Sequence, residues 1–165
     1  MEFKLLDLKK HSRPITCIKF NREGDLLFSA SMDLLENNIL LWNPKNGELV
    51  GEYKGHLGVV KSIDVNYYST LLISSGSDKT VRFWKVETGE EILSMAHLSM
   101  MTCCRWSNSE KYIACVQESL SDIKSCIFVY RISDELRLDR NPKNRIYNIK
   151  NMYFNKNKNL FKNKK

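Results

Sequence analysis

The sequence predicts an all-β fold built from repeated units of four short strands. The clearest unit is residues 55–85, where a Gly-His pair precedes two strand-like apolar runs, a Ser-Gly-Ser-Asp turn and the segment Thr-Val-Arg-Phe-Trp. Glycine and polar clusters mark the turns, and near-alternating Val, Ile, Phe, Tyr and Trp mark strands of about five residues. Such units, closing on a tryptophan and repeating about every 40 to 45 residues, are typical of β-propeller blades.

The unit recurs along the chain. The residues that open the units are spaced 45 and 41 positions apart, and those that close them are spaced 42 and 46 positions apart. In each unit an apolar residue follows the histidine after four positions and a small residue follows after six, so we expect three units in register. The opening residues are His11, His56 and His97, and the closing residues are Trp42, Trp84 and Tyr130.

Two of the units carry a matching set of four side chains. Serine and aspartate follow the histidine by 18 and 22 positions in both. This spacing predicts a hydrogen-bond chain from the indole N–H through serine and histidine to the aspartate carboxylate, which stabilises a blade only if every member is satisfied. The two sets are His11, Ser29, Asp33 and Trp42, and His56, Ser74, Asp78 and Trp84.

A set of serine, histidine and aspartate is also the catalytic constellation of a serine protease. Here the set recurs at the repeat period and each copy ends on a tryptophan, whereas an enzyme needs one nucleophile. The sequence has no glycine-rich phosphate loop, and its five cysteines form no C-x-x-C pair. We therefore expect a structural network, with no catalytic residue, metal ligand, cofactor or small-molecule substrate.

The units resemble WD repeats. Three stretches, ITCIKFNREGDLLFS, GHLGVVKSIDVN and LISSGSDKTVRFW, further resemble the i-subunit family of eukaryotic translation initiation factor three. The resemblance covers residues 8 to about 132, roughly the first three blades of a family that normally has seven. It implies a partial WD40-type propeller that is a non-enzymatic scaffold, assembling with the b and g subunits and, through them, with the small ribosomal subunit. An adaptor family that associates with serine/threonine kinase receptors shares much of the pattern, and this alternative stays open.

The domain organisation follows from the repeats. Residues 1–8 would form an N-terminal strand that closes the ring in a full propeller, 9–53 the first blade, 54–95 the second and 96–133 an incomplete third. We expect the Asn- and Lys-rich residues 134–165 to be disordered. Three blades would form an open wedge, whose strand edges favour self-association or aggregation.

The units are not identical. The segment LLENN, residues 34–38, lengthens the turn after the aspartate of the first unit by three positions relative to the second. The third unit has Cys115 and Ser119 at the serine and aspartate positions and a tyrosine in place of tryptophan. We therefore expect no network of this kind in the third unit.

The net charge of +7 is concentrated at one end of the chain. Residues 139–165 carry +8, so the remaining 138 residues carry −1 and offer no broad surface for phosphate backbones. Three interpretations of the basic segment stay open: an arm that binds RNA, a solvated tail, or a tail that was never selected, such as one translated from an intron in an AT-rich genome.

The remaining expectations concern location and contacts. No apolar run approaches the roughly 18 to 20 residues that span a bilayer, and the start MEFKLLDLKKH mixes charges with apolar residues, so we expect a cytoplasmic protein without membrane contacts. The cysteines are expected to be buried structural thiols. Arg13, Lys61 and the 34–38 segment are the candidate exposed contacts for a partner.

Overall fold

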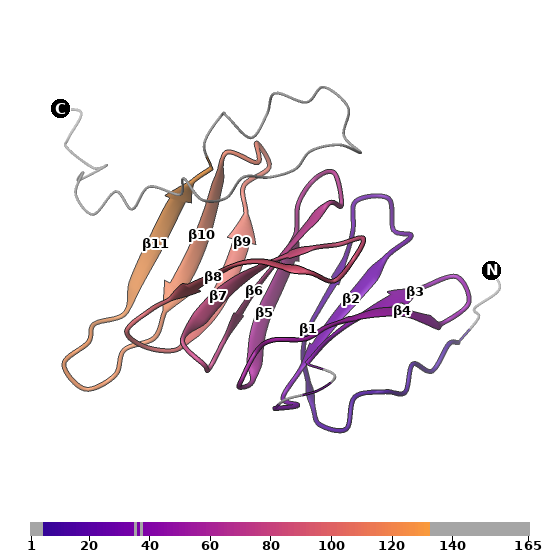
Figure 1. Ribbon diagram of the computed structural model, residues 1–165, viewed down its shortest axis with the longest axis horizontal. Coiled ribbons are helices and arrows are strands. Elements are labelled where there is room, and N and C mark those ends of the chain that lie inside the picture. The colour runs from indigo at the N-terminus through magenta and orange to yellow at the C-terminus, as the bar shows by residue number, and fades with distance from the viewer. Residues whose placement is uncertain (1–4, 35, 37, 133–165) are drawn as a thin grey trace.

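The computed structural model describes residues 5–34, 36 and 38–132. Within these residues the chain forms eleven β-strands and no helix, which confirms the all-β prediction (Figure 1). The strands are β1 (Ile15–Phe20), β2 (Leu27–Ser31), β3 (Ile39–Asn43), β4 (Glu48–Tyr53), β5 (Val60–Val65), β6 (Leu71–Gly76), β7 (Thr80–Lys85), β8 (Glu91–Ala96), β9 (Met101–Trp106), β10 (Tyr112–Gln117) and β11 (Cys126–Arg131).

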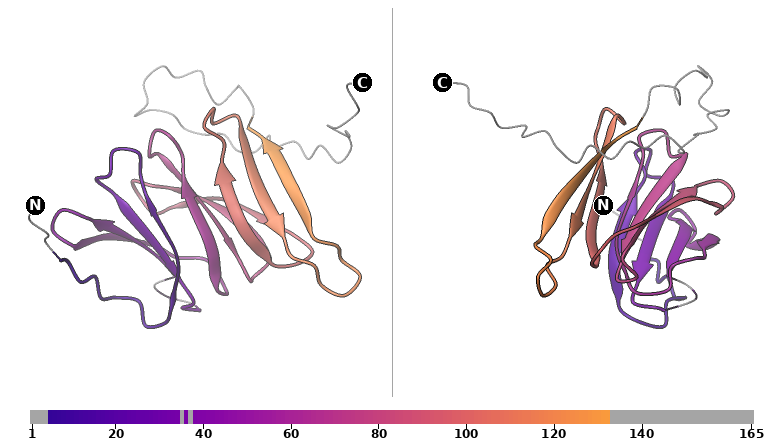
Figure 2. Two further views of the ribbon diagram at one scale, coloured as in Figure 1. Left: turned by 180° about the vertical axis from the view of Figure 1, so that it is seen from behind. Right: turned by 60° about the vertical axis from the view of Figure 1, so that its left-hand side comes forward.

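In the described part of the chain the strands form three antiparallel sheets, each a simple meander. The first sheet has the order β1-β2-β3-β4, the second β5-β6-β7-β8 and the third β9-β10-β11. The opening strands β1, β5 and β9 lie next to one another, and the sheets fan out from them (Figures 1 and 2). The fan does not close on itself, so the predicted open wedge is confirmed.

Tight glycine turns join the third and fourth strands of the first two sheets. Gly47 and Gly89 occupy the same repeat position, with φ of 78° and 71°. Their N–H groups donate to the carbonyl oxygens of Asn43 and Lys85 at 2.8 and 2.9 Å. Because positive φ favours glycine, each turn depends on the glycine that marked it in the sequence.

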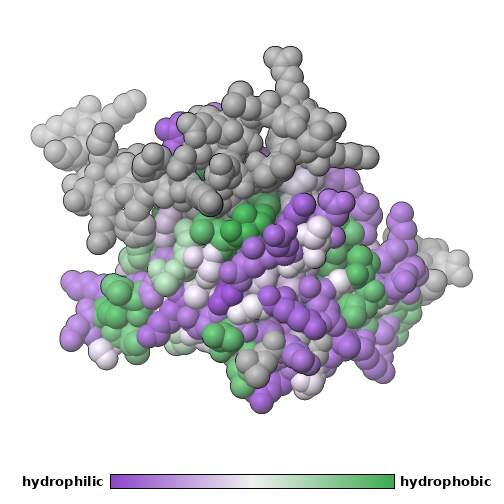
Figure 3. All heavy atoms as spheres, in the orientation of Figure 1, coloured by the Kyte–Doolittle hydropathy of each residue, from purple (hydrophilic) through white to green (hydrophobic). Residues whose placement is uncertain are grey.

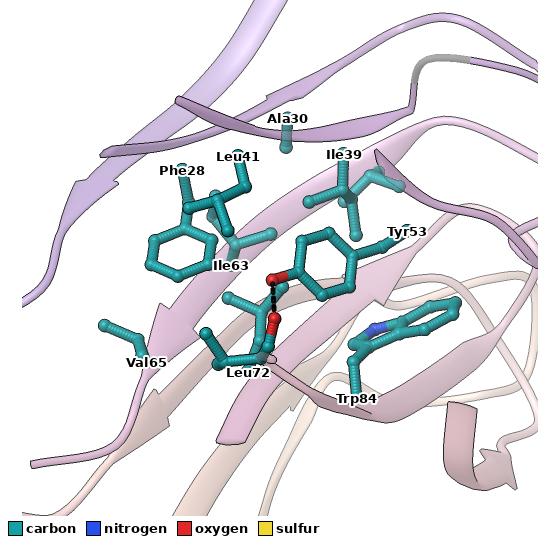
Figure 4. Packing of buried hydrophobic residues seen from close by; sticks show 11 residues of the cluster. Phe28, Ala30, Ile39, Leu41, Tyr53, Ile63, Val65, Leu72 and Trp84 are labelled. Carbon is teal, nitrogen blue, oxygen red and sulfur yellow. Dashed lines mark hydrogen bonds between the residues drawn. The ribbon is translucent and has the colours of Figure 1, made fainter. Parts of the chain in front are cut away.

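The hydrophobic core lies between the sheets. The first and second sheets enclose a cluster in which Phe28 and Tyr53 pack against Ile63, Leu72 and Trp84 (Figure 4). The Tyr53 and Trp84 rings meet edge to face with centroids 6.0 Å apart. The second and third sheets enclose a second cluster, built from Leu71, Ile73, Val81, Phe83, Met101, Cys104, Ile113, Cys115, Tyr130 and Ile132.

The cysteine prediction is only partly correct. All five cysteines are free; Cys104 and Cys115 are buried, but Cys17, Cys103 and Cys126 are only half-buried. Burial raises the pKa of the Cys115 thiol to about 12 and also raises that of Cys104, so both are uncharged apolar fillers of the core. Cys104 and Cys115 belong to the cluster between the second and third sheets, whereas the other three cysteines lie outside it.

Only part of the predicted N-terminal strand, and none of the segment 134–165, lies within the described residues. Residues 5–8 carry no strand, and residues 1–4 and 133–165 lie outside the described residues. The N-terminal strand and the disordered segment 134–165 therefore stay predictions. None of the described segments is a helix long and apolar enough to cross a membrane.

Candidate functional site

The second sheet assembles all four residues of its predicted set. His56 lies in the loop before β5, Ser74 in β6, Asp78 in the turn after β6 and Trp84 in β7. The indole N–H of Trp84 donates to Ser74 Oγ at 2.8 Å, and Ser74 Oγ lies 2.7 Å from His56 Nε2. His56 Nδ1 in turn lies 2.8 Å from Asp78 Oδ2. The imidazole that fits this chain accepts from serine at Nε2 and donates to the carboxylate from Nδ1.

The Asp78 carboxylate binds the neighbouring turn in addition to the histidine. It accepts hydrogen bonds from the Leu57 N–H at 3.1 Å and from the Thr80 hydroxyl at 2.8 Å. Burial acts to raise the pKa of Asp78, but the hydrogen bond from His56, with those from the other donors, outweighs it and holds the pKa below its ordinary value. The carboxylate therefore stays ionised and ties the loop before β5 to the β6–β7 turn.

Gly76 is a site residue that the sequence reasoning missed. A Cβ atom at this position would lie 3.1 Å from both Asp78 Oδ1 and His56 Nδ1. A side chain at residue 76 would crowd both groups, so the glycine leaves room for the aspartate and the imidazole to meet. The signal was present in the Ser-Gly-Ser-Asp turn, where the glycine was assigned to turn geometry alone.

The first sheet assembles only three of its four predicted residues into a chain. Trp42 Nε1 donates to Ser29 Oγ at 2.8 Å, and Ser29 Oγ lies 2.6 Å from His11 Nε2. His11 Nδ1 then lies 3.4 Å from Asp33 Oδ2, and it has no hydrogen-bond partner among the described residues. The chain therefore stops at the histidine.

Asp33 instead takes its donors from serines. It accepts from the N–H and hydroxyl of Ser12 and from the hydroxyl of Ser31 at 2.8 Å. These bonds outweigh the effect of burial, which acts in the opposite direction, and lower the pKa of Asp33. In the longer turn, the Asn38 side chain donates to the carbonyl oxygens of Asp33 and Gly58 at 2.9 and 3.2 Å. These hydrogen bonds hold the turn in place of a hydrogen bond between aspartate and histidine.

The third sheet replaces the network with one direct contact. The Tyr130 hydroxyl lies 3.3 Å from His97 Nε2, and the His97 ring also packs on Phe128 with centroids 4.9 Å apart. Burial lowers the pKa of His97. Cys115 occupies the serine position within the core, and Ser119 is exposed. A phenol reaches the imidazole directly, whereas an indole needs the serine between them.

A catalytic interpretation of the second set fails on access. The distances among Ser74, His56 and Asp78 match those of a hydrolytic triad. However, Ser74 and His56 are 0% and 2% exposed, and the serine oxygen already accepts the Trp84 N–H. A substrate carbonyl cannot approach this hydroxyl, so the arrangement can hold strands and turns together but cannot attack a bond.

The structure does not bring the two candidate partner contacts into either network. Arg13 is exposed in the loop before β1. Lys61 is half-buried in β5, so it presents less surface than the sequence interpretation expected. Of the long turn, Leu34 and Glu36 are exposed, Asn38 is buried, and Leu35 and Asn37 lie outside the described residues.

One further polar link was missed from sequence. The buried Asp64 of β5 receives the Lys19 ammonium of β1 at 2.9 Å on one oxygen and the N–H of Trp106 in β9 at 2.8 Å on the other. The carboxylate thus connects all three sheets of the described chain. Residues eight positions after each histidine are Lys19, Asp64 and Arg105, and this recurring charged position was the available signal.

Comparison with known proteins agrees with the fold. The model of the family "WD domain, G-beta repeat" matches residues 3–43 and 47–85. The crystal structure of the Myceliophteria thermophila Cps50 (Swd1) β-propeller domain superposes with a TM-score of 0.63 at 18% identity, covering 75% of this chain and 38% of that one. The repeats, the sheets and these matches together define a WD-repeat β-propeller protein, and the chain belongs to the WD-repeat family.

The curated relatives are more specific. Proteins named eukaryotic translation initiation factor 3 subunit I are similar to the chain, at 34% identity over 125 residues in Schizosaccharomyces pombe, covering 76% of the chain and 37% of the relative. The Bombyx mori protein is 44% identical over 106 residues, covering 64% and 31%. The Drosophila willistoni protein is 46% identical over 102 residues, covering 62% and 31%. The chain spans about a third of the length of these relatives.

Proposed function

We propose that the chain is a non-enzymatic scaffold segment of the translation initiation factor three type. The observation that carries the proposal is its similarity to subunit I, which reaches 34% identity over 125 residues and so extends across all three sheets. The inaccessible serines support a role without catalysis. Rigid sheets that present loops are suited to binding other proteins, because function concentrates in loops held by a rigid scaffold.

The proposed partners are the b and g subunits of the same factor, and the small ribosomal subunit is reached through them. A cytoplasmic location goes with this role. Arg13 is proposed as a contact because its exposed side chain lies beside the loop that Ser12 and Asp33 fix by hydrogen bonds. Lys61 is the second proposed contact, through the exposed part of its side chain.

Affinity purification of the tagged full chain from cytosol, followed by mass spectrometry, tests this function. We expect the b and g subunits to co-purify, and a variant with Arg13→Ala and Lys61→Ala to recover several-fold less of them. Leu98→Ala, another exposed loop residue, is the matched control and should recover wild-type amounts. Recovery of kinase receptors in place of initiation factor subunits would support the adaptor alternative and refute the proposal.

RNA binding through the basic segment is the second candidate function, favoured by the +8 charge of residues 139–165. Its signature is an RNA affinity that falls steeply with salt and is lost when residues 139–165 are deleted. Co-purification of initiation factor subunits that survives this deletion would favour the scaffold.

A further inference from the structure

Each sheet can be divided into two faces by the neighbour that it meets. The forward face of the first sheet, directed at the second, consists of Phe28, Ala30, Ile39 and Leu41, which are 0 to 5% exposed. The rear face of the second sheet meets it with Ile63, Val65, Leu72 and Trp84. These two faces make the first junction between sheets.

The second junction repeats this arrangement at the same repeat positions. Ile73, Ser75, Val81 and Phe83 form the forward face of the second sheet, and all four are fully buried. Strand register is also repeated, since Ile73 lies opposite Phe83 as Phe28 lies opposite Leu41. The rear face of the third sheet supplies Cys104, Ile113, Cys115 and Tyr130. The chain therefore makes the same type of interface twice.

The forward face of the third sheet has the same register but is partly exposed. Ala114 lies opposite Val129, and Val116 lies opposite Ile127, at the positions that are buried in the other two sheets. Ile127 and Val129 are 70% and 55% exposed, whereas their equivalents in β3 and β7 are at most 5% exposed.

Part of the rear face of the first sheet is also exposed, although Trp42, the equivalent of Trp84, is 4% exposed. Ile18 and Phe20 of β1 are 62% and 50% exposed, whereas their equivalents Ile63 and Val65 in β5 are 0% and 8% exposed. The first and third sheets lie at the two ends of the fan (Figure 2). On the face seen in Figure 3, the hydrophobic residues that are coloured appear as separate patches among hydrophilic ones. The two open faces are thus the two halves of an interface that the chain already forms twice.

We propose that two copies of this chain pair head to tail and close a ring of six sheets. The forward face of the third sheet in one copy packs on the rear face of the first sheet in the other, and a two-fold axis repeats the contact. Six sheets fall within the four to eight that closed propellers contain. A contact between two different faces must either close a ring or continue into a filament, and closure satisfies both faces of both copies.

Light scattering during size-exclusion chromatography tests the assembly. We expect the full chain to have twice the mass of one copy at micromolar concentration, without growth to larger species as concentration rises. Two charged variants block one face each: Ile18→Lys with Phe20→Lys on the rear face, and Ile127→Lys with Val129→Lys on the forward face. All four positions are at least half exposed in one chain, so each variant should keep the wild-type circular dichroism spectrum.

The mixing experiment decides between modes of pairing. Each variant alone has lost one half of the contact and should be monomeric, whereas an equimolar mixture should recover a dimer, because one rear face and one forward face remain. Leu57→Lys with Leu98→Lys, at exposed loop positions off both faces, should leave the wild-type dimer intact. A monomeric wild type, filaments, or either variant dimerising alone would overturn the proposal.

Discussion

At the scale of single residues, the two histidine networks differ by one hydrogen bond. His56 Nδ1 reaches Asp78 at 2.8 Å, while the His11 Nδ1 atom remains 3.4 Å from Asp33 without a hydrogen bond. A hydrogen bond to a charged group contributes about 1.5–3 kcal/mol, so the histidine of the second sheet is the better held of the two.

Replacement of Asp78 by asparagine tests this difference. We expect Asp78→Asn to lower the free energy of unfolding at pH 7 by about 2 kcal/mol. Because the folded-state pKa of Asp78 lies below the value of 3.8 for the unfolded chain, the carboxylate stabilises the fold above pH 3.8, and this contribution is lost as pH falls below it.

Urea denaturation at pH 7 and at pH 3 measures the effect, and the gap between wild type and variant should narrow at pH 3. Asp33→Asn is the matched control, expected to cost less at pH 7 because it removes no bond to histidine. An equal gap at both pH values would contradict the assignment.

At the scale of elements, Asp64 joins three strands from three sheets. Its carboxylate is 3% exposed and receives both the Lys19 ammonium and the Trp106 N–H. The Lys19 side chain is 42% exposed, so solvent screens that ion pair, and the backbone bond to β9 is the stronger part of the link.

A double-mutant cycle separates the two contacts. We expect Asp64→Ala to lower the free energy of unfolding by about 2–4 kcal/mol, since it leaves the Trp106 N–H and the ammonium without their acceptor. Lys19→Met should cost less, with a coupling energy to Asp64 of about 0.5 kcal/mol. Chemical denaturation of the wild type, the two single variants and the double variant gives these values. A coupling energy as large as the Asp64→Ala effect would show that the ion pair, and not the Trp106 N–H bond, is the stronger contact.

The strands and the histidine networks show how much of the structure could be predicted from the sequence. The strands form where apolar alternation predicts them, and turn residues mark the ends of β1, β4 and β9 clearly. The four-residue chain in the second sheet follows from regular offsets. Offsets failed in the first sheet, where the longer turn lets Asn38 and two serines replace the contact to histidine, and in the third, where Tyr130 reaches His97 without an intervening residue. Side-chain reach and turn geometry are not encoded in spacing.

At the scale of the whole molecule, the sheets form a short array in which each contacts only its neighbours. Stability in such arrays is the sum of the units and their junctions. The second sheet has a neighbour on both sides, whereas the first and third have one each within the described chain. In a single, unpaired copy, loss of one junction should therefore release the sheet beyond it without releasing the sheet on the other side.

Truncation of Phe83 in the monomeric variant with Ile18→Lys and Phe20→Lys tests this independence. Phe83→Ala empties part of the second junction, and we expect a loss of about 3–5 kcal/mol, with faster amide hydrogen exchange in β9–β11 than in β1–β4. Phe28→Ala, the corresponding change at the first junction, should give the reverse pattern. Exchange that rises uniformly in both variants would indicate a single cooperative unit. Peptide-resolved mass spectrometry distinguishes the two outcomes.

The three tryptophans lie one to each sheet: Trp42 in β3, Trp84 in β7 and Trp106 in β9. Their surroundings differ, since the first two indoles are buried against serine hydroxyls and the third is partly open to solvent. The protein thus contains its own set of fluorescent reporters. Phenylalanine at any two of these positions would leave a single tryptophan, whose selectively excited emission follows the melting of one sheet with no dye attached.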